Sequence, residues 1–509
     1  MAWFEKPGYL ERLDIYTLAF LLILALAALV RLHQLGQPYL WQDEIYGAWA
    51  SKNFLEGHGF SYPVGEGYPY HRALLTYLLP MTLSFSVLGY TEFAARLPSV
   101  IMGLSAIAVV YLLGKDLGGE KLGLIASGMM ALDLWVIMWH TQARMYAHSQ
   151  FLYLLGVWLV YRWYGRDRLA LHSRYLYLLI PTLVLGVHNS EPFLGIVPVI
   201  GVFLVSGLLS KLTVPGWRNQ IRENTFVRRH ILWIAIGGLI GSFYMVLDGW
   251  QFIHSLMDYA PVWYQRGRGF LYYFWFLAEN TGLHFLFGLG FALSWMKKDN
   301  WILPLAFLVP FVFQSMLYFK EPRLIFHLYP LFLLMCAVPL VYLLNTAESF
   351  LRSKDVLPGR AGMVSILAVF LVLAALYVPV QDLEPKGENH REPVKFISGK
   401  MSEDDILLSS APSITGWYMG GMEHVDYDLN YLDNRNVSGE LRDPKIGLKA
   451  PRNGAAMERI ISENSGWVIA DDNFYARHKI RGDVKQVIVE NSRRIENKSW
   501  SGVKVYRFR

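Results

Sequence analysis

Two adjacent carboxylates, Asp43 and Glu44, stand in the stretch YLWQDEIYGAW, soon after the first long apolar run of the chain. A carboxylate at a membrane edge is usually only solvated, but aromatic neighbours lower the local dielectric and raise its affinity for a proton. Such a group suits a general base. Asp43 would begin a helix, where an acid also favours the N-terminus. One carboxylate can therefore cap the helix while the other acts as base, and the sequence leaves the two roles unassigned.

Cations in the stretch HTQARMYAH could meet an anionic group on the same side of a membrane. Arg144 and His148 are four residues apart, so on a continuing helix they would share a face. The alternative is that Arg144 only extends its charged end toward water while its stem stays in the apolar layer.

The stretch FKEPRLIFHLYP offers a second group of cations. Pro322 suits the first turn of a helix, and on that helix Arg323 and His327 would again be four residues apart. A helix N-terminus with Lys320 and Arg323 beside it is an anion site, although plain membrane anchoring is the alternative.

Two further polar groups allow two interpretations each. Arg266 and Arg268, in WYQRGRGF, could close over a phosphate or lie in a solvated loop. His188, in HNSE, could bind an acceptor sugar, or its neighbours could cap the helix that Pro192 begins. Taken with the acids, the cations suit group transfer in which a lipid phosphate is the leaving group and cations stabilise its developing charge.

These residues must be positioned by membrane helices, because the composition is that of a multi-span membrane protein. The chain of 509 residues is 54% hydrophobic, 15% aromatic and only 17% charged, whereas soluble domains carry roughly 25% charged residues. No basic run suggests a nucleic-acid groove, so nucleic acid is not an expected partner. The lone Cys336 cannot form an internal disulfide.

Apolar runs of the length that a span needs predict about eleven transmembrane helices. They cover residues 14–33, 93–114, 122–139, 147–163, 175–187, 193–209, 231–247, 271–295, 301–319, 324–344 and 363–380. Residues 73–87 are also apolar, but Pro80 and several hydroxyl groups interrupt them. We expect a helix there that lies along the interface, in the first outer loop.

The distribution of Lys and Arg sets the predicted orientation. With the N-terminus in the cytoplasm, each predicted inner loop is basic, and the acids Asp43 and Glu44 lie outside. A full span at 73–87 would reverse all later loops, which argues against it. The protein is therefore predicted to be a multi-pass protein of the cell membrane.

The composition changes after Val380. PVQDLEPKGENHREP is a polar, Pro-containing linker. Beyond it, the strand-like runs DILLSS, GWVIADD, KQVIVE and VKVYRF alternate with helical stretches such as residues 457–463. We therefore expect two domains, a membrane domain at 1–380 and a small extracytoplasmic α/β domain at 381–509.

The order of several motifs resembles the GT-C membrane glycosyltransferases of the protein O-mannosyltransferase and aminoarabinose-transferase type. WQDEIYGAW resembles their acidic first-loop motif, and PYHRALLTYLLPMTLSFSVLG resembles the interfacial helix that follows. TEFAARLPSVIMGLSAIAVVYLLGKDLGGEKLGLIASGMMAL resembles the next two spans, QARMYA stands at the second outer loop, and PRLIFHLYPLFLL resembles a later Arg-containing span. The resemblance covers the membrane part and is strongest at residues 13–163.

The resemblance implies an inverting transferase that takes a sugar from a polyprenyl-phosphate donor and passes it to a hydroxyl group of a protein, lipid or glycan. Asp43 would be the catalytic base and Glu44 its companion. The resemblance places Arg144, Lys320 and Arg323 near the donor phosphate, and His71 and Arg72 near the substrate cleft. We further predict that His327, Arg266 and Arg268 bind the donor phosphate and that Tyr146 and His188 bind substrate.

A divalent metal ion is only a weak expectation. The oligosaccharyltransferase branch carries acids in its second outer loop, but here that loop reads HTQARMYAH and has none. A site formed by Asp43 with His140 and His148 is conceivable, since carboxylate and imidazole bind such metals. Catalysis without a metal, with cations in its place, is the prediction.

Two other classes of protein compete with a transferase. A lipid-linked glycan flippase or transporter predicts charged or broken helices near the middle of the bilayer, often with internal repeats. A non-catalytic assembly subunit could have the same fold. The clustering of ionisable residues at one face, and the presence of Asp43, favour the transferase.

Overall fold

The computed structural model describes residues 15–62, 70, 73–165, 167, 170, 172–202, 269–296, 301–316, 320–353, 389–430, 435–437, 440–443, 446–471, 481–497, 500 and 502–509. The predicted spans 231–247 and 363–380 lie outside these residues, as do His71, Arg72, Arg266 and Arg268.

Contacts between Cα atoms divide the chain into two compact units. Unit 1 comprises Met1–Val30, Ile101–His140 and Met145–Val380. Unit 2 comprises Arg31–Val100, Thr141–Arg144 and Gln381–Arg509. The residues around Asp43 and Glu44 thus share a unit with the C-terminal part of the chain. The domain boundary expected at residue 380 stays a prediction.

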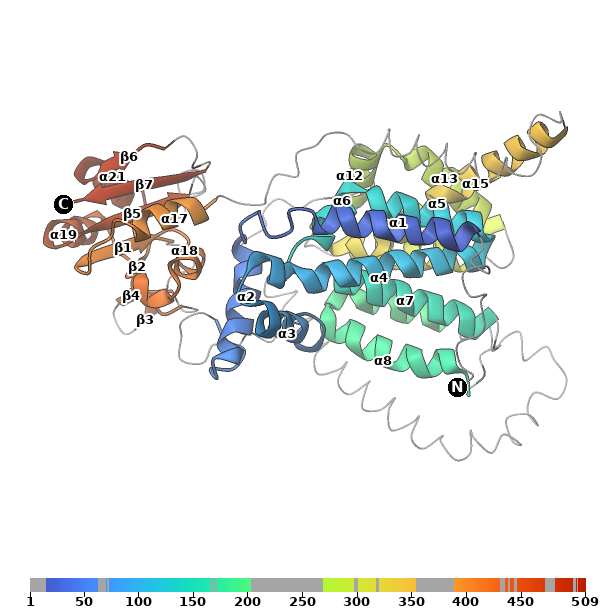
Figure 1. Ribbon diagram of the computed structural model, residues 1–509, viewed down its shortest axis with the longest axis horizontal. Coiled ribbons are helices and arrows are strands. Elements are labelled where there is room, and N and C mark those ends of the chain that lie inside the picture. Colours follow the sequence, from blue (N-terminus) through green and yellow to red (C-terminus); the bar gives the residue numbers. More distant parts are fainter. Residues whose placement is uncertain are drawn as a thin grey trace, which may run out of the picture. The chain divides into compact units, whose positions relative to one another are not determined.

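Unit 1 is made of helices (Figure 1), several of which are strongly apolar. The helices that lie wholly or mainly in it are α1 (Ile15–Leu32), α4 (Glu92–Gly118), α5 (Glu120–Leu132), α6 (Leu134–His140), α7 (Tyr146–Gly165), α8 (Arg174–Asn189), η3 (Glu191–Gly195), α12 (Tyr272–Thr281), α13 (His284–Met296), α14 (Ile302–Met316), η4 (Pro322–Leu328) and α15 (Tyr329–Ser353). Helix α7 packs on α8, and α15 packs on both α13 and α5.

Several of these helices could cross a membrane. Within the described residues, Ile15–Leu32, Glu92–Gly118 and Pro322–Phe350 are long and apolar enough, and two bent helix pairs raise the number of such segments to as many as 5. The number of eleven spans stays a prediction.

The segment predicted as a span at 122–139 is not one continuous helix. Helices α5 and α6 meet at a bend of 68°. The carboxylate of Asp133 accepts a hydrogen bond from the Val136 amide at 2.9 Å and another from the Tyr329 hydroxyl at 2.8 Å. It therefore caps α6, because a side-chain oxygen satisfies an amide that the helix start leaves unpaired.

The predicted span at 271–295 is broken as well. Helices α12 and α13 meet at a bend of 115°. Gly282 follows α12 with φ +62°, a left-handed conformation that glycine adopts without strain and that ends helices. The polar run Glu279 to Thr281 precedes this turn and is a signal of the break. It is short beside the apolar residues on either side of it, so the composition of the whole segment still predicted one span.

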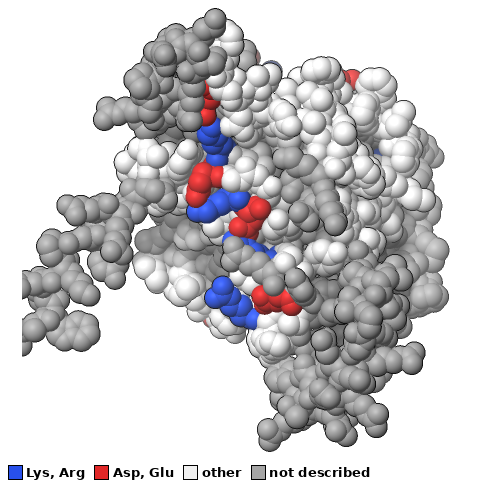
Figure 2. Space-filling view, turned by 90° about the vertical axis from the view of Figure 1, so that its right-hand side faces the viewer, with Lys and Arg blue, Asp and Glu red and all other residues white. Residues whose placement is uncertain are grey.

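Ion pairs join helix ends in unit 1. Figure 2 shows one face of the molecule on which basic and acidic side chains alternate in a row. The pairs at such helix ends include Lys115–Glu120, Lys121–Glu348 and Arg162–Asp116. Residues that the sequence assigns to inner basic loops therefore have acidic partners, while the orientation itself stays a prediction.

The first part of unit 2 is helical. Helix α2 spans Gln42–Leu55, and the π-helix η2 (Leu74–Leu78) continues into α3 (Leu79–Leu88), as the sequence predicts for residues 73–87. Apolar side chains four residues apart are exposed along one face, at Leu75, Leu79, Leu83 and Val87. Such an apolar stripe suits an interfacial helix, a location that stays a prediction.

The C-terminal part of unit 2 is a small α/β domain. Its helices are α17 (Arg391–Ser398), α18 (Pro412–Met419), η5 (Met422–His424), α19 (Gly454–Glu463) and α21 (Gly482–Asn491). Its strands are β1 (Asp405–Ser409), β2 (Tyr427–Asp428), β3 (Arg435–Val437), β4 (Glu440–Arg442), β5 (Ser465–Asp471), β6 (Arg493–Ile495) and β7 (Val503–Phe508). One sheet has the order β2-β1-β5-β7-β6, and β3 pairs with β4.

Helices cover both faces of the five-stranded sheet. Strands β2, β1 and β5 are parallel, whereas β7 runs antiparallel to β5 and to β6. Neighbouring residues of a strand point to opposite faces: Leu408 packs with residues of α19 and α21, and Leu407 packs with residues of α17. Apolar residues on consecutive positions are therefore both buried, which explains the continuous hydrophobic runs.

One predicted strand is wrong. KQVIVE, residues 485–490, lies within helix α21. Val484 and Ile488 are buried four residues apart, while Val489 is 54% exposed. This is the helical period, which the run of β-branched residues concealed.

Candidate active site

Asp43 and Glu44 lie in the first turn of α2. Trp41 precedes the helix with an extended backbone, and its amide donates to Glu44 Oε2 at 3.3 Å. This is the capping arrangement in which an acid at the third helical position reaches back to the residue before the helix. Consecutive helical residues point about 100° apart, so the two carboxylates have different surroundings.

Glu44 is fully buried and held by nitrogen donors. Arg96, on α4, binds it in a bidentate manner, with Nε 2.9 Å from Oε1 and Nη2 2.7 Å from Oε2. The Ala143 amide also donates to Oε1, at 2.6 Å. Both side chains are nearly excluded from solvent, at 5% exposure for Arg96 and 0% for Glu44. The carboxylate thus has donors on both oxygens, as a buried charge requires.

Arg96 also fixes the turn that leads into α2. Its two Nη atoms donate to the backbone carbonyls of Leu35, Pro38 and Tyr39, at 3.1, 2.7 and 2.9 Å. One guanidinium therefore ties the Glu44 carboxylate to the preceding turn. Arg96 is not among the predicted site residues, although a cation close to the start of an apolar span is a signal of function or structure.

Asp43 has a more open environment. Its side chain is 30% exposed, and its Oδ2 lies 3.4 Å from Nη2 of Arg144. Nη1 of Arg144 donates to the Asp43 backbone carbonyl at 2.7 Å. Arg144, itself 3% exposed, therefore holds both the backbone and the side chain of Asp43.

Arg144 does not share a helix face with His148, which corrects the prediction. Helix α7 begins at Tyr146, so Arg144 lies in the turn before it. The Ser99 hydroxyl donates to the Arg144 carbonyl at 3.2 Å.

Tyr77 supports the turn before α7, which contains Ala143 and Arg144. Its hydroxyl donates to the Ala143 carbonyl at 2.7 Å. Burial, followed by the neighbouring Tyr70, raises the pKa of Tyr77 well above its ordinary value, so the hydroxyl keeps its proton. Gly47 permits the approach, because a Cβ atom there would lie 2.0 Å from the Tyr77 hydroxyl.

The cations of the later stretch belong to unit 1. Lys320 is 7% exposed, and burial lowers the pKa of its ammonium group. Pro322–Leu328 forms a 3-10 helix with three residues per turn, so Arg323 and His327 do not share a face as predicted. His327 is buried, with its ring 4.8 Å from that of Tyr153.

The remaining predicted residues of unit 1 are mostly buried. Tyr146 packs edge-on against Trp139 at 4.5 Å, and His148 is 1% exposed. His188 is half-buried in the last turn of α8. His140 Nε2 lies 2.7 Å from Gln150 Oε1.

Catalysis without a metal ion stays a prediction. Among the described residues, no three His, Cys, Asp or Glu side chains gather as a candidate site.

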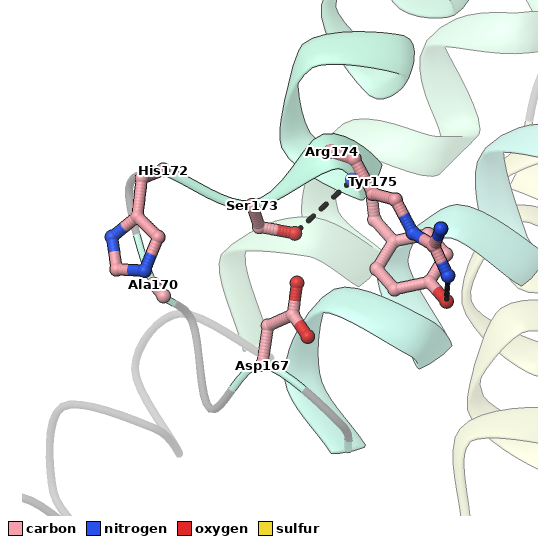
Figure 3. A pocket seen from close by; sticks show the side chains of 6 residues that line it. All are labelled: Asp167, Ala170, His172, Ser173, Arg174 and Tyr175. Atoms are coloured by element: carbon pink, nitrogen blue, oxygen red, sulfur yellow. Dashed lines mark hydrogen bonds between the residues drawn. The ribbon is translucent and has the colours of Figure 1, made fainter.

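A surface cavity of about 570 Å³ lies apart from the acids in sequence, between the end of α7 and the start of α8. Figure 3 shows Asp167, His172 and Arg174 around it, with Ser173 capping α8 through the Tyr175 amide at 3.1 Å. The Arg174 guanidinium lies against the Tyr175 ring, 5.0 Å from its centre. The predicted site residues do not include any of these.

The chain shares its fold with solved structures of membrane glycosyltransferases, which are ArnT and an archaeal oligosaccharyltransferase, and several of its described helices are long and apolar enough to cross a membrane. Residues 73–215 match the family model described as dolichyl-phosphate-mannose-protein mannosyltransferase. The predicted resemblance to the protein O-mannosyltransferase and aminoarabinose-transferase type is thereby confirmed. The matched residues include Arg96 and Arg144 but not Asp43.

The similar solved structures include ArnT from Cupriavidus metallidurans in the apo state, with a TM-score of 0.57 and 12% identity, covering 97% of this chain and 98% of that chain. ArnT bound to undecaprenyl phosphate has the same TM-score and identity, covering 96% and 97%. The Archaeoglobus fulgidus oligosaccharyltransferase in the apo form has a TM-score of 0.56 and 13% identity, covering 96% and 73%. At these identities the similarity establishes the fold. No curated protein sequence matches significantly.

Proposed function

We propose that the protein is an integral membrane glycosyltransferase that moves a sugar from a polyprenyl-phosphate donor to a hydroxyl acceptor on the extracytoplasmic face. Asp43 is the general base. The observation that carries this assignment is the division of labour between the neighbouring acids: donors surround Glu44 on both oxygens, whereas Asp43 is 30% exposed and oriented by Arg144. An acid that must reach an acceptor needs the second environment.

In the proposed reaction, Asp43 takes the proton of the acceptor hydroxyl. The hydroxyl oxygen then attacks the anomeric carbon, and the bond from that carbon to the phosphate oxygen breaks on the opposite side. The configuration at the carbon is inverted, and polyprenyl phosphate leaves with the bonding electrons. Cationic side chains stabilise the negative charge that develops on this leaving group.

We assign the cationic role to Lys320 and Arg323. These residues are close together in the sequence, and η4 begins between them, at Pro322. Arg144 instead orients Asp43, since both ends of its guanidinium contact that residue. Glu44 is then a positioning residue. This division narrows the broader expectation that both acids are catalytic and that Arg144 binds phosphate.

The donor class is supported by two comparisons. The matched family model is described as a dolichyl-phosphate-mannose-protein mannosyltransferase, and ArnT is seen with undecaprenyl phosphate. Both involve a polyprenyl-type phosphate. The acceptor is defined only by its hydroxyl group, in a protein, lipid or glycan.

The first experiment measures sugar release from a panel of polyprenyl-monophosphate sugars by purified protein and by its Asp43→Asn variant. Loss of a general base should lower the rate about 10²–10⁴-fold, with donor binding retained. Equal rates in the two proteins would remove Asp43 as the base. A parallel series with a chelator decides whether a divalent metal takes part.

A second experiment tests the assignment of Arg323. Charge-assisted hydrogen bonds contribute roughly 1.5–3 kcal/mol, so Arg323→Ala should weaken donor binding about ten- to a hundredfold. Arg174→Ala, which removes a cation beside the surface cavity at the start of α8, is the matched control. Unchanged donor affinity in Arg323→Ala would remove this residue from the site.

A further inference from the structure

The α/β domain contacts the turn that leads into the acid-bearing helix. This turn, Leu35 to Trp41, precedes α2, and Arg96 holds three of its carbonyls. Two other backbone groups of the turn bind side chains of the C-terminal domain. The Leu40 amide donates to the Tyr418 hydroxyl at 2.8 Å, and the Gln37 carbonyl accepts from Nη2 of Arg391 at 2.7 Å.

Glu92, in the first turn of α4, connects these two side chains. Its Oε1 accepts from the Tyr418 hydroxyl at 3.3 Å and from Nη1 of Arg391 at 3.1 Å. A hydroxyl group can donate and accept at the same time, so Tyr418 links the Leu40 amide to the Glu92 carboxylate. Glu92 is four residues from Arg96, hence one turn along the same helix.

A second contact fixes α2 itself. The indole Nε1 of Trp49 donates to the Ser413 carbonyl at 2.9 Å in a buried position. The Trp49 ring also meets Trp417 edge-on at 5.4 Å. Helix α18, which carries Ser413, Trp417 and Tyr418, therefore touches α2 both at its entry turn and about two turns into the helix.

We propose that Tyr418 is a positioning residue for the reaction, through which the C-terminal domain orients Asp43. This inference rests on the proposed function. The Leu40 amide is three residues before Asp43, and the turn it belongs to is the one that Arg96 and Glu44 clamp from the other side. A displacement of the order of 1 Å at a catalytic group can cost about 10²-fold in rate, so a small loosening of this turn has a measurable effect.

The test compares wild-type protein with Tyr418→Phe, which keeps the ring and removes the hydroxyl. Tyr427→Phe removes a hydroxyl from the same domain at the cluster formed with α19 and α21, and is the matched control. Amide hydrogen exchange in peptides that cover residues 35–44 should become faster in Tyr418→Phe only. The kcat for transfer should fall roughly tenfold to a hundredfold, with KM for the donor unchanged.

Each result decides something different. Unchanged exchange in Tyr418→Phe overturns the proposal whatever the activity, and faster exchange with unchanged kcat reduces Tyr418 to a structural contact. A rise in KM as large as the fall expected in kcat, with kcat itself unchanged, would make Tyr418 a binding residue instead. If wild-type protein transfers no sugar, the proposed function fails, and the exchange experiment still decides whether the domain orders this turn. Arg391→Gln, which breaks the other two contacts, is a second variant should Tyr418→Phe not fold.

Discussion

The two adjacent carboxylates should respond very differently to loss of charge, and Glu44→Gln is the more informative change. The variant keeps the size of the side chain but leaves the Arg96 guanidinium without its counter-charge in a site where both side chains are at most 5% exposed. It also turns an amide NH₂ toward one of the two backbone amides that now donate to the carboxylate. Breaking such a buried pair costs about 3–5 kcal/mol.

Asp43→Asn is the matched control, one residue away. Asp43 is 30% exposed, and its contact with Arg144 is 3.4 Å long. Because the Asp43 side chain is in contact with water and Arg144 keeps its hydrogen bond to the Asp43 carbonyl, loss of this charge should cost only about 1 kcal/mol. The difference between the two variants should therefore be about 3 kcal/mol, or more than a hundredfold in the folded-to-unfolded ratio.

The assay is unfolding in mixed micelles with increasing denaturing detergent, followed by tryptophan fluorescence. Arg96→Met and the double variant complete a thermodynamic cycle, because the double change removes both buried charges and should cost less than the sum of the single changes. If Glu44→Gln were as stable as Asp43→Asn, or if the effects of Glu44→Gln and Arg96→Met were additive, the ion pair of Arg96 with Glu44 would not hold the turn that leads into α2.

Three further outcomes follow from the packing and the protonation of single groups. Gly47→Ala should destabilise the protein by about 1–3 kcal/mol, because its Cβ would lie 2.0 Å from the Tyr77 hydroxyl; combination with Tyr77→Phe should recover part of the loss in the same unfolding assay. Burial lowers the pKa of His390 from 6.5 to about 4, so the unfolded chain binds the proton more readily and stability falls as the pH falls from about 6.5 toward 4. In His390→Gln, the fall in the free energy of unfolding across that pH window should be smaller by about 3 kcal/mol. An unchanged pH dependence would contradict the assignment. Asp133→Ala should cost about 0.5–2 kcal/mol through loss of the α6 cap, with Tyr329→Phe smaller; a neutral Asp133→Ala would show that the bend does not need its carboxylate.

Much of the fold follows from hydropathy, but the breaks in the helices do not. A single Asp133 between apolar residues leaves the mean hydropathy of a span high, so the bend of 68° has no compositional signal. The strand expected at 485–490 failed for a related reason, since β-branched residues there also have the four-residue spacing of a buried helix face. Both errors arise where tertiary contacts decide between two acceptable local structures.

The site is only partly visible in the sequence. The pair Asp43 and Glu44 is conspicuous because it is charged and sits among aromatic residues. Its division into one clamped and one accessible acid depends on Arg96, which is 52 residues away from Glu44. The contact of Tyr418 with Leu40 joins residues 378 positions apart, and no local pattern signals it.

That last separation has a consequence for the order in which the protein is made. The acid-bearing helix is synthesised early, whereas α18 is synthesised near the end. At the usual rate of about 5–20 residues per second, 378 residues take roughly 20–75 s. During that time the Leu40 amide and the Trp49 indole have none of their contacts with the C-terminal domain. The contacts of Arg96 with this turn can form early, whereas those of α18 form only once the C-terminal domain has been made, so a nascent chain that stops before residue 413 lacks the contacts of Leu40 and Trp49 with that domain.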